Sequence, residues 1–326
     1  MADYPGRQPL RPGPRREALS AGSVTVWRNT NLEIGLEVVT VAQSPSGAVD
    51  APEPADLARA LGWTAQHTEQ ALCCLCGIPG DPVMAVAPFG VVRCPICDLA
   101  FVSPRLSAAA LQRMYDDPGY FEDTVYGDPT GRSPAMVLQR TWTAGRLSGL
   151  VARRPPPGRL LEIGTGYGYF LAAARDAGYD VRGVELSRTG TAHARDRHGL
   201  EVFRGQLDSA PADPPADVIC FWDTLEHVPD PLEFLRQVRL RLADDGVFAL
   251  SVPSFASAPA RLLGARWWTL KPEQHIWLFT PTTLRLLAAR AGLVLTSVVT
   301  SPLRRANAGR TDSLVAFGRA LPQVDR

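Results

Sequence analysis

The sequence predicts an α/β protein built on a doubly wound, mostly parallel sheet of seven strands. Three observations support this fold class. The apolar segment Leu160–Ile163 runs into a turn with three alternating glycines and then into a stretch of helical character. A second apolar segment, Val181–Glu185, ends on a carboxylate about 20 residues further on, as in doubly wound folds. Five more β-rich runs follow, with room for helices between most of them.

The turn after the first strand reads Gly164-Thr-Gly166-Tyr-Gly168, and the next residues, 171–177, are predicted to be helical. Glycine has no Cβ, so the backbone can approach a bound nucleotide closely there. The spacing is G-x-G-x-G and not the G-x-G-x-x-G of dinucleotide-binding folds. Glu162 lies two positions before the first glycine. We therefore expect a nucleotide-like cofactor at this turn, with Glu185 accepting hydrogen bonds from its ribose.

The other elements can be assigned in chain order. A helix is predicted over Arg140–Arg153, before the first strand, and another over Thr282–Ala291, where Gly292 is suited to end it. The five further strands that we expect are Glu201–Phe203, Asp217–Phe221, Gly246–Val252, Leu293–Thr300 and Ser313–Gly318.

The fourth strand leads into Trp222-Asp-Thr-Leu-Glu-His-Val-Pro-Asp-Pro231. With the glycine turn and Glu185, this segment resembles the class I S-adenosylmethionine (SAM) methyltransferases. The match is to the D-x-L-E-H-V-x-D-P signature of the small-molecule group that includes enzymes of ubiquinone biosynthesis. The resemblance covers about residues 73–320 and is most specific at 160–231. It implies SAM as the cofactor and an antiparallel hairpin that closes the sheet.

The resemblance also implies roles for particular residues. A residue in Gly205-Gln206-Leu207-Asp208, after the third strand, usually meets the adenine, and Asp223 can lie near the positively charged methionyl end. The cofactor-binding residues that we predict are Glu162, Gly164, Gly166, Gly168, Glu185, Gln206, Asp208 and Asp223.

Five of the six cysteines fall within residues 73–97, and such clustering favours a metal over disulfides. The pairs Cys73-x-x-Cys76 and Cys94-x-x-Cys97 can close a tetrahedral structural Zn²⁺ site. Buried free thiols are the alternative, and Cys74 could replace Cys73 only as a less usual pair. The run from Cys94 to Pro104 resembles the zinc ribbon before the SAM domain of some bacterial biosynthetic methyltransferases, which usually have glycine where this chain has Asp98.

The chain divides into four predicted parts: a disordered tail (1–22), an accessory segment (23–70), the zinc ribbon (71–106) and the methyltransferase domain (107–326). Within the accessory segment, residues 23–42 suggest a hairpin, 44–54 a linker and 56–72 a helix. The sequence leaves open whether this segment dimerises, caps the substrate or binds a partner.

The composition excludes several classes. With 45% hydrophobic and 21% charged residues the chain is globular, and its net charge of +1 gives no field that would attract polyanions. No apolar run approaches the ~18 residues of a membrane helix. The start has no apolar signal region, so we expect a cytoplasmic protein with no membrane partner. Arginine replaces almost every lysine, which suggests a GC-rich bacterial genome.

Two histidines are candidates for catalysis. His227 follows the fourth strand, and His275 lies in the connection after the fifth strand, which typically caps the substrate pocket of this fold. Three roles stay open: a structural one, a general base that removes the acceptor's proton, with His275 slightly favoured, and a divalent-cation site. For the last, Asp223, Glu226, His227 and His275 resemble an E-x-x-E-H…H arrangement, with Asp in place of the first Glu.

The predicted function is SAM-dependent methylation of a small biosynthetic metabolite, suggestive of bacterial secondary metabolism, on oxygen, carbon or nitrogen. Nucleic-acid methylation is an alternative, because zinc ribbons often bind RNA or DNA. The near-zero net charge disfavours it, as does Phe221-Trp222-Asp223 in place of an N-P-P-aromatic motif. A non-catalytic module that holds a partner is a second alternative. A carrier protein that delivers the acceptor, or a homodimer, also stays open.

Overall fold

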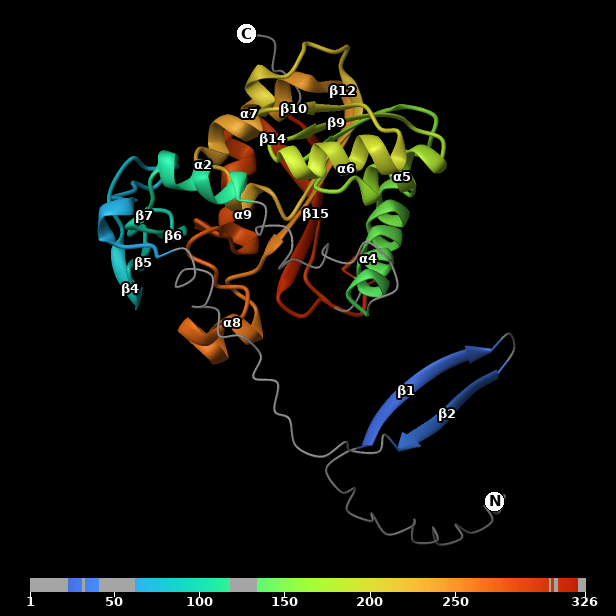
Figure 1. Ribbon diagram of the computed structural model, residues 1–326, viewed down its shortest axis with the longest axis horizontal. Coiled ribbons are helices and arrows are strands. Elements are labelled where there is room, and N and C mark those ends of the chain that lie inside the picture. Colours follow the sequence, from blue (N-terminus) through green and yellow to red (C-terminus); the bar gives the residue numbers. More distant parts are fainter. Residues whose placement is uncertain are drawn as a thin grey trace, which may run out of the picture. The chain divides into compact units, whose positions relative to one another are not determined.

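The computed structural model describes residues 62–117, 134–304, 306–307 and 310–321, together with the backbone of two N-terminal strands (Figure 1). These strands, β1 (Ser23–Thr30) and β2 (Glu33–Thr40), pair antiparallel from Ser23↔Thr40 to Thr30↔Glu33, which confirms the predicted hairpin. They belong to a unit, residues 1–51, that is separate from residues 52–326. The predicted tail 1–22 and linker 44–54 lie outside the described residues.

The main unit is organised around the predicted seven-stranded sheet. Its strand order is β10-β9-β8-β11-β12-β15-β14; the first four pairings are parallel, and those of β15 with β12 and β14 are antiparallel. All seven predicted strands are therefore confirmed, as is the closing hairpin. The strands are β8 (Arg159–Ile163), β9 (Asp180–Glu185), β10 (Val202–Arg204), β11 (Ala216–Trp222), β12 (Leu242–Pro253), β14 (Leu293–Val299) and β15 (Ser313–Ala320).

Helices cover both faces of this sheet (Figure 1). On one face lie α4 (Pro134–Val151), α5 (Tyr169–Asp176) and α6 (Arg188–His198), where Leu150, Leu171 and Ala194 share a core with the strands. On the other lie α7 (Pro231–Arg241) and α9 (Pro281–Arg290). Helix α4 begins six residues before its predicted start, and α9 begins where the Thr280 side chain accepts from the Thr283 amide.

A smaller module precedes the sheet, and we call residues 68–107 the cysteine module. Its strands are β3 (Thr68–Glu69), β4 (Asp81–Val86), β5 (Phe89–Arg93), β6 (Ala100–Val102) and β7 (Arg105–Leu106). Helix α2 (Ala108–Asp116) follows it, capped by the Ser107 side chain. Its sheet has the order β13-β6-β5-β4, and β13 (Trp277–Leu278) comes from the connection after β12. The module and the main sheet are thus joined by strand pairing.

The predicted helix over 56–72 is wrong in the part that the structure describes. Ala65–His67 forms a single 3-10 turn, and Thr68 and Glu69 enter strand β3, which pairs with β7. Pairing with a strand more than 30 residues away overrides the local helical propensity here. The connection between β12 and α9 carries α8 (Ala258–Leu263) and a short 3-10 turn, Gly264–Arg266.

Candidate functional site

The glycine turn lies between β8 and α5 and has left-handed backbone at all three glycines. A Cβ at Gly164 would lie 2.5 Å from the Thr224 hydroxyl oxygen, and one at Gly168 would lie 2.8 Å from a Leu200 methyl. A Cβ at Gly166 would meet no atom within 4 Å. Gly164 and Gly168 therefore allow close packing inside the protein, whereas Gly166 faces open space that a ligand can enter.

Glu185, at the end of β9, is buried against this turn. One carboxylate oxygen accepts from the Gly166 amide at 2.7 Å and the other from the Ser187 amide, also at 2.7 Å. Burial raises the pKa of Glu185, and these backbone donors oppose the shift. Each oxygen of an ionised carboxylate has a second lone-pair site, so Glu185 can hold the turn and still accept from a ribose diol.

Glu162, on β8, is a second buried carboxylate and is only 2% exposed. Its Oε2 has no hydrogen-bond partner among the described residues. Burial raises its pKa well above the usual range, and the positive charge of Arg146 only partly opposes this. A buried, unpartnered acceptor is costly to leave unsatisfied. Glu162 therefore fits a site that receives a donor or a positive charge from a bound ligand, as SAM would supply.

Gln206 and Asp208 follow β10, where the chain makes a 3-10 turn over Leu207–Ser209. The Gly205 amide donates to the Glu185 carbonyl at 3.0 Å, so this loop starts at the end of β9. Both side chains are exposed, while Leu207 is buried. The parallel strands β8 to β11 end at one edge of the sheet, so all the predicted cofactor residues lie along that edge.

Asp223, just after β11, is held by two arginines that sequence reasoning missed. Its carboxylate accepts from Arg146 at 2.6 Å and from Arg310 at 2.7 and 2.9 Å. These cations lower the pKa of Asp223 far below its usual range against the effect of burial. The Ser251 hydroxyl donates to it as well, at 3.0 Å. The expectation that Asp223 would share a cation site with Glu226 and the two histidines is therefore wrong, because its oxygens are committed to arginine.

Replacing Asp223 by Asn is expected to lower the free energy of unfolding at pH 7 by about 2–3 kcal/mol. Removing one partner leaves the Arg146 charge, 4% exposed, without its counter-ion. The loss is smaller than for a fully buried pair, because Asp223 keeps 31% of its side chain exposed. Because the pKa of Asp223 is lower in the folded protein than in the unfolded chain, its ionised carboxylate stabilises the fold at pH values above the unfolded pKa of about 4. This contribution is lost progressively as the pH falls below that value towards the folded pKa.

Urea unfolding at pH 7 and near pH 3 would measure this effect. The difference in the free energy of unfolding between D223N and wild type should be smaller at the lower pH. Asp245→Asn is the control, since it removes an ion pair to Arg154 from a carboxylate that is 75% exposed. That change should cost less than ~1 kcal/mol. Equal stability losses in the two variants would contradict a structural role for the Asp223 pairs.

Glu226, His227 and His275 form the second part of the site. Their ligand atoms lie within 4.8 Å of one another, and the two imidazole rings meet edge-on at 4.7 Å between centroids. Glu226 is 1% exposed, and neither of its oxygens has a hydrogen-bond partner in the part of the chain that the structure describes. Burial, and then the negative charge of Asp223, raise the pKa of Glu226 well above its usual range.

The two histidines are neutral at pH 7. Burial lowers the pKa of His275 to about 4, and burial with the nearby His275 lowers the pKa of His227 well below its usual range. His275 Nδ1 lies 2.7 Å from the Thr269 carbonyl, which can only accept, so Nδ1 carries the proton and Nε2 keeps a lone pair. His227 Nδ1 lies 3.3 Å from the Tyr115 hydroxyl. His275 therefore presents an unprotonated Nε2.

The loop that carries His227 lies directly against the glycine turn. The Thr224 hydroxyl donates to the Ile163 carbonyl at the end of β8, and its side chain occupies the space beside Gly164. Three residues later, His227 completes a 3-10 turn. The structure thus brings together the predicted cofactor turn and the predicted catalytic histidines.

The four predicted metal ligands also come together. The ligand atoms of Cys73, Cys76, Cys94 and Cys97 lie within 4.8 Å of one another, so Cys73 and not Cys74 belongs to the cluster. Each pair forms the same turn: the Gly77 amide donates to the Cys73 carbonyl, and the Asp98 amide to the Cys94 carbonyl. Asp98 adopts φ 62°, where glycine is the usual residue, and its carboxylate pairs with Arg93 at 2.9 Å.

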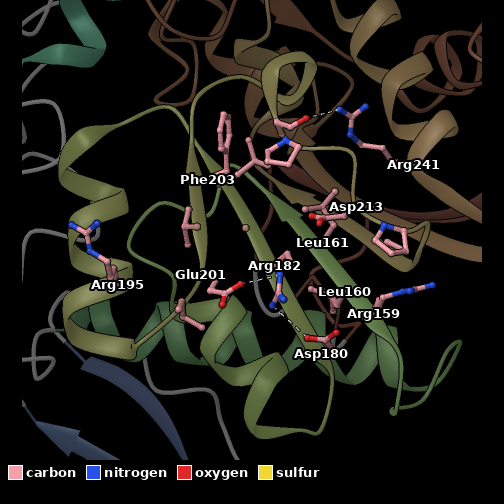
Figure 2. Close-up of a pocket in the computed structure, with 18 of the residues that line it drawn as sticks. Arg159, Leu160, Leu161, Asp180, Arg182, Arg195, Glu201, Phe203, Asp213 and Arg241 are labelled. Carbon is pink, nitrogen blue, oxygen red and sulfur yellow. Dashed lines mark hydrogen bonds and ion pairs between the residues drawn. The ribbon is translucent and has the colours of Figure 1, made fainter.

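A cavity of about 770 Å³ opens elsewhere, on the sheet face beside β8, β9 and β10. Figure 2 shows Leu161, Phe203 and Arg182 around it, with Arg182 between Asp180 and Glu201. None of the predicted cofactor residues lines it. The connection 205–215 between β10 and β11 has no α-helix, and its prolines at 211, 214 and 215 explain why. The cavity therefore lies where a crossover helix would cover the sheet.

Comparison with known proteins agrees with this fold. Residues 138–298 match the family described as Methyltransferase domain. Over 151 residues the chain is 33% identical to a ubiquinone biosynthesis O-methyltransferase of Cereibacter sphaeroides, covering 41% of this chain and 60% of that protein. Over 97 residues it is 30% identical to a probable SAM-dependent methyltransferase of Mycolicibacterium smegmatis, covering 29% and 38%. The chain thus spans less than two thirds of the length of either relative.

A solved structure with the same architecture is magnesium protoporphyrin IX methyltransferase of Synechocystis with bound S-adenosylhomocysteine. It has a TM-score of 0.52 and 15% identity, and the match covers 66% of this chain and all of that one. The residues that match the family include the glycine turn and most strands of the main sheet. Residues 138–298 of this chain are thus similar to the methyltransferase domain family, and the main unit has the class I methyltransferase fold.

Proposed function

We propose that this protein transfers a methyl group from SAM to a small biosynthetic metabolite. The observation that carries the proposal is the contact between the two halves of the site, where Thr224 packs on Gly164 and leads directly to Glu226 and His227. SAM supplies a methyl group already activated by its sulfonium. The chain's own residues would bind and align it, with Gly166 leaving the path open and Glu185 accepting from the ribose.

His275 is the residue that we propose as general base for the acceptor's proton. Its Nδ1–H is held by the Thr269 carbonyl, so Nε2 is the atom that can take a proton. Burial keeps the ring neutral at pH 7, although a pKa of about 4 makes it a weak base in the free protein. An acceptor whose own acidity rises on binding, such as a phenol or an acidic C–H, suits such a base better than an alcohol.

A divalent cation held by Glu226, His227 and His275 is a second possibility for the same atoms. The two unpartnered oxygens of Glu226 and the neutral imidazoles have the donor types that a cation with nitrogen and oxygen ligands requires. Such a cation could lower the pKa of an acceptor hydroxyl. Both proposals use the lone pair of His275 Nε2, and chelation distinguishes them.

His275→Ala is expected to lower turnover of the acceptor by roughly 10²-fold or more, because the proton then has no positioned acceptor. SAM affinity, measured by calorimetry, should stay unchanged. If Nε2 acts as a base, wild-type turnover should also survive treatment with EDTA that leaves the four-cysteine site loaded; if it binds a cation, turnover should fall and return with added metal. An unaffected rate in H275A would assign the ring to a structural role.

For the four cysteines we propose a structural Zn²⁺. Four thiolates complete the coordination of a four-coordinate Zn²⁺ and leave no open position for chemistry. Cys73 and Cys94 are buried in the same core cluster as Phe101 and Trp277, so a metal there would stabilise the junction between the cysteine module and the main sheet.

The class of acceptor can be tested with methyl-labelled SAM and a cell extract from the source organism. We expect the label in a low-molecular-weight fraction, because the net charge of +1 offers no surface field for a polyanion. Methyl transfer to an oxygen atom would agree with the ubiquinone biosynthesis O-methyltransferase to which the chain is similar. Transfer to a carbon or nitrogen atom would also agree with the proposal. Label in RNA or DNA, or label nowhere while SAM still binds, would contradict the proposal and favour a nucleic-acid enzyme or a non-catalytic binding module.

The partners of the protein and its location in the cell can also be proposed. We expect no membrane partner; in the described part of the chain no helix combines the length and apolar character needed to cross a bilayer. Action in the cytoplasm, and a carrier protein or a second copy of the chain as partner of the N-terminal segment, remain proposals that localisation and sizing experiments would test.

A further inference from the structure

The two histidine-bearing segments of the site are joined to each other through the residues that follow them. The Ile276 amide donates to the Glu226 carbonyl at 2.9 Å, and the Trp277 indole donates to the Val228 carbonyl at 2.8 Å. The first bond joins the residue after His275 to the residue before His227. The second joins the residue two positions after His275 to the residue after His227. The distance between the two imidazoles therefore depends on how these segments are held together.

The cysteine module contacts both segments and fixes their positions. Strand β6 pairs with β13 through Phe101↔Trp277, and the Val102 amide donates to the Ile276 carbonyl at 2.9 Å. The module thus fixes the segment that carries His275 by backbone hydrogen bonds, directly next to the ring.

Arg105, on strand β7 of the module, reaches the other segment. Its Nη1 donates to the Pro229 carbonyl at 3.3 Å, two residues after His227. Its guanidinium also lies over the Trp277 ring at 5.9 Å, and its Nε pairs with Glu69 at 3.3 Å. The side chain is only 16% exposed. One arginine therefore contacts both segments at once.

We propose that Arg105 is a positioning residue, through which the cysteine module sets the spacing of the His227 and His275 rings. The guanidinium suits this role because its planar group can stack on an indole while its N–H groups donate in the same plane. The proposal rests on the proposed function in one respect only, which is that the His227 and His275 rings take part in methyl transfer. The positions of the two rings can be tested without a methyl acceptor.

Arg105→Met tests the proposal, with Arg93→Met as the matched control. Arg93 belongs to the same module, forms one ion pair with Asp98 and lies over the Phe255 ring at 5.7 Å, so it offers the same kinds of interaction. No described hydrogen bond connects it to residues 226–230. The difference between the two variants therefore isolates the contact with the histidine segment.

The chain has five histidines, so NMR of the imidazole groups can follow each one. In R105M we expect the imidazole signals of His227 and His275 to change, while those of His193 and His198 on α6 stay as in wild type. R93M should leave all four unchanged. Binding of S-adenosylhomocysteine and metal content should match wild type in both variants. Trp277→Phe, which removes the indole N–H that donates to Val228 and leaves a smaller ring beneath Arg105, should move the His227 signal in the same way.

Once the acceptor is known, R105M should lower kcat by about tenfold to a hundredfold with little change in cofactor affinity, because small displacements of reacting groups are costly. Arg105→Lys should recover part of this loss. Unchanged His227 and His275 signals in both R105M and W277F would overturn the proposal, even if methyl transfer itself is established. Conversely, a failed H275A test would remove the catalytic role of the rings and leave the positioning result standing.

Discussion

Gly166→Trp is expected to abolish SAM binding. Gly166 is the glycine of the turn whose missing side chain leaves open space, and its amide donates to Glu185. An indole placed there would fill the path of the cofactor. We expect calorimetry to show a loss of affinity of at least about 10³-fold, or about 4 kcal/mol, from a wild-type affinity at about the micromolar level.

The substitution also introduces strain, because Gly166 has φ 52° and a left-handed backbone costs a side chain roughly 1–2 kcal/mol. Gly199→Trp is the control for this cost: Gly199 has φ 63°, ends α6, and a Cβ there would also meet nothing within 4 Å. Both variants should lose a similar amount of stability in thermal melts, but only G166W should lose SAM. Unchanged binding in G166W would show that the cofactor does not enter beside this turn.

Cys94→Ser is expected to remove zinc and destabilise the whole main unit. Metal analysis of wild-type protein purified without chelators should give about one zinc per chain, and the variant should retain little. Where a structural zinc site forms only in the folded state, its binding free energy contributes to folding and can reach about 10 kcal/mol or more. Because Cys94 shares its core cluster with Phe101, Trp277 and the strands of the main sheet, we expect the melting temperature to fall for both parts together.

Cys74→Ser provides the matched control, since Cys74 is adjacent to a ligand in sequence but outside the four-cysteine cluster and only half-buried. It should keep its zinc and most of its stability. Zinc-free wild-type protein with a normal melting temperature would contradict the metal proposal. Loss of zinc in C94S without any change in the melting of the main sheet would instead show that the two parts are energetically independent.

Most of the fold was predictable because its signals are local. Each strand of the main sheet appears as a short apolar run, and the glycine turn and the two cysteine pairs are read from fixed spacing. The predicted helix over 56–72 fails for the opposite reason. There the local pattern competes with pairing between Thr68 and Leu106, which only the folded chain makes available.

The residues of the candidate site likewise include some that local sequence patterns indicate and others that only the folded chain brings together. Sequence reasoning placed Glu185, Gly166, His227 and His275, which follow strands that could be assigned. It could not find the partners that define their state. Arg146 and Arg310 reach Asp223 across 77 and 87 residues, and no spacing rule connects them. The resemblance to the E-x-x-E-H…H arrangement therefore left a cation site that includes Asp223 open as one of three roles.

The amino-acid sequence by itself determined the sheet, the glycine turn and the grouping of four cysteines, because hydrophobic periodicity and short-range spacing depend only on residues that are close together in the chain. Only the tertiary structure decided which charges are neutralised, which nitrogen of His275 is free, and that a strand from the connection carrying His275 completes the sheet of the cysteine module. Those features arise from contacts such as Arg105 with Pro229, 124 residues apart, which exist only once the chain has folded and its long loops have closed.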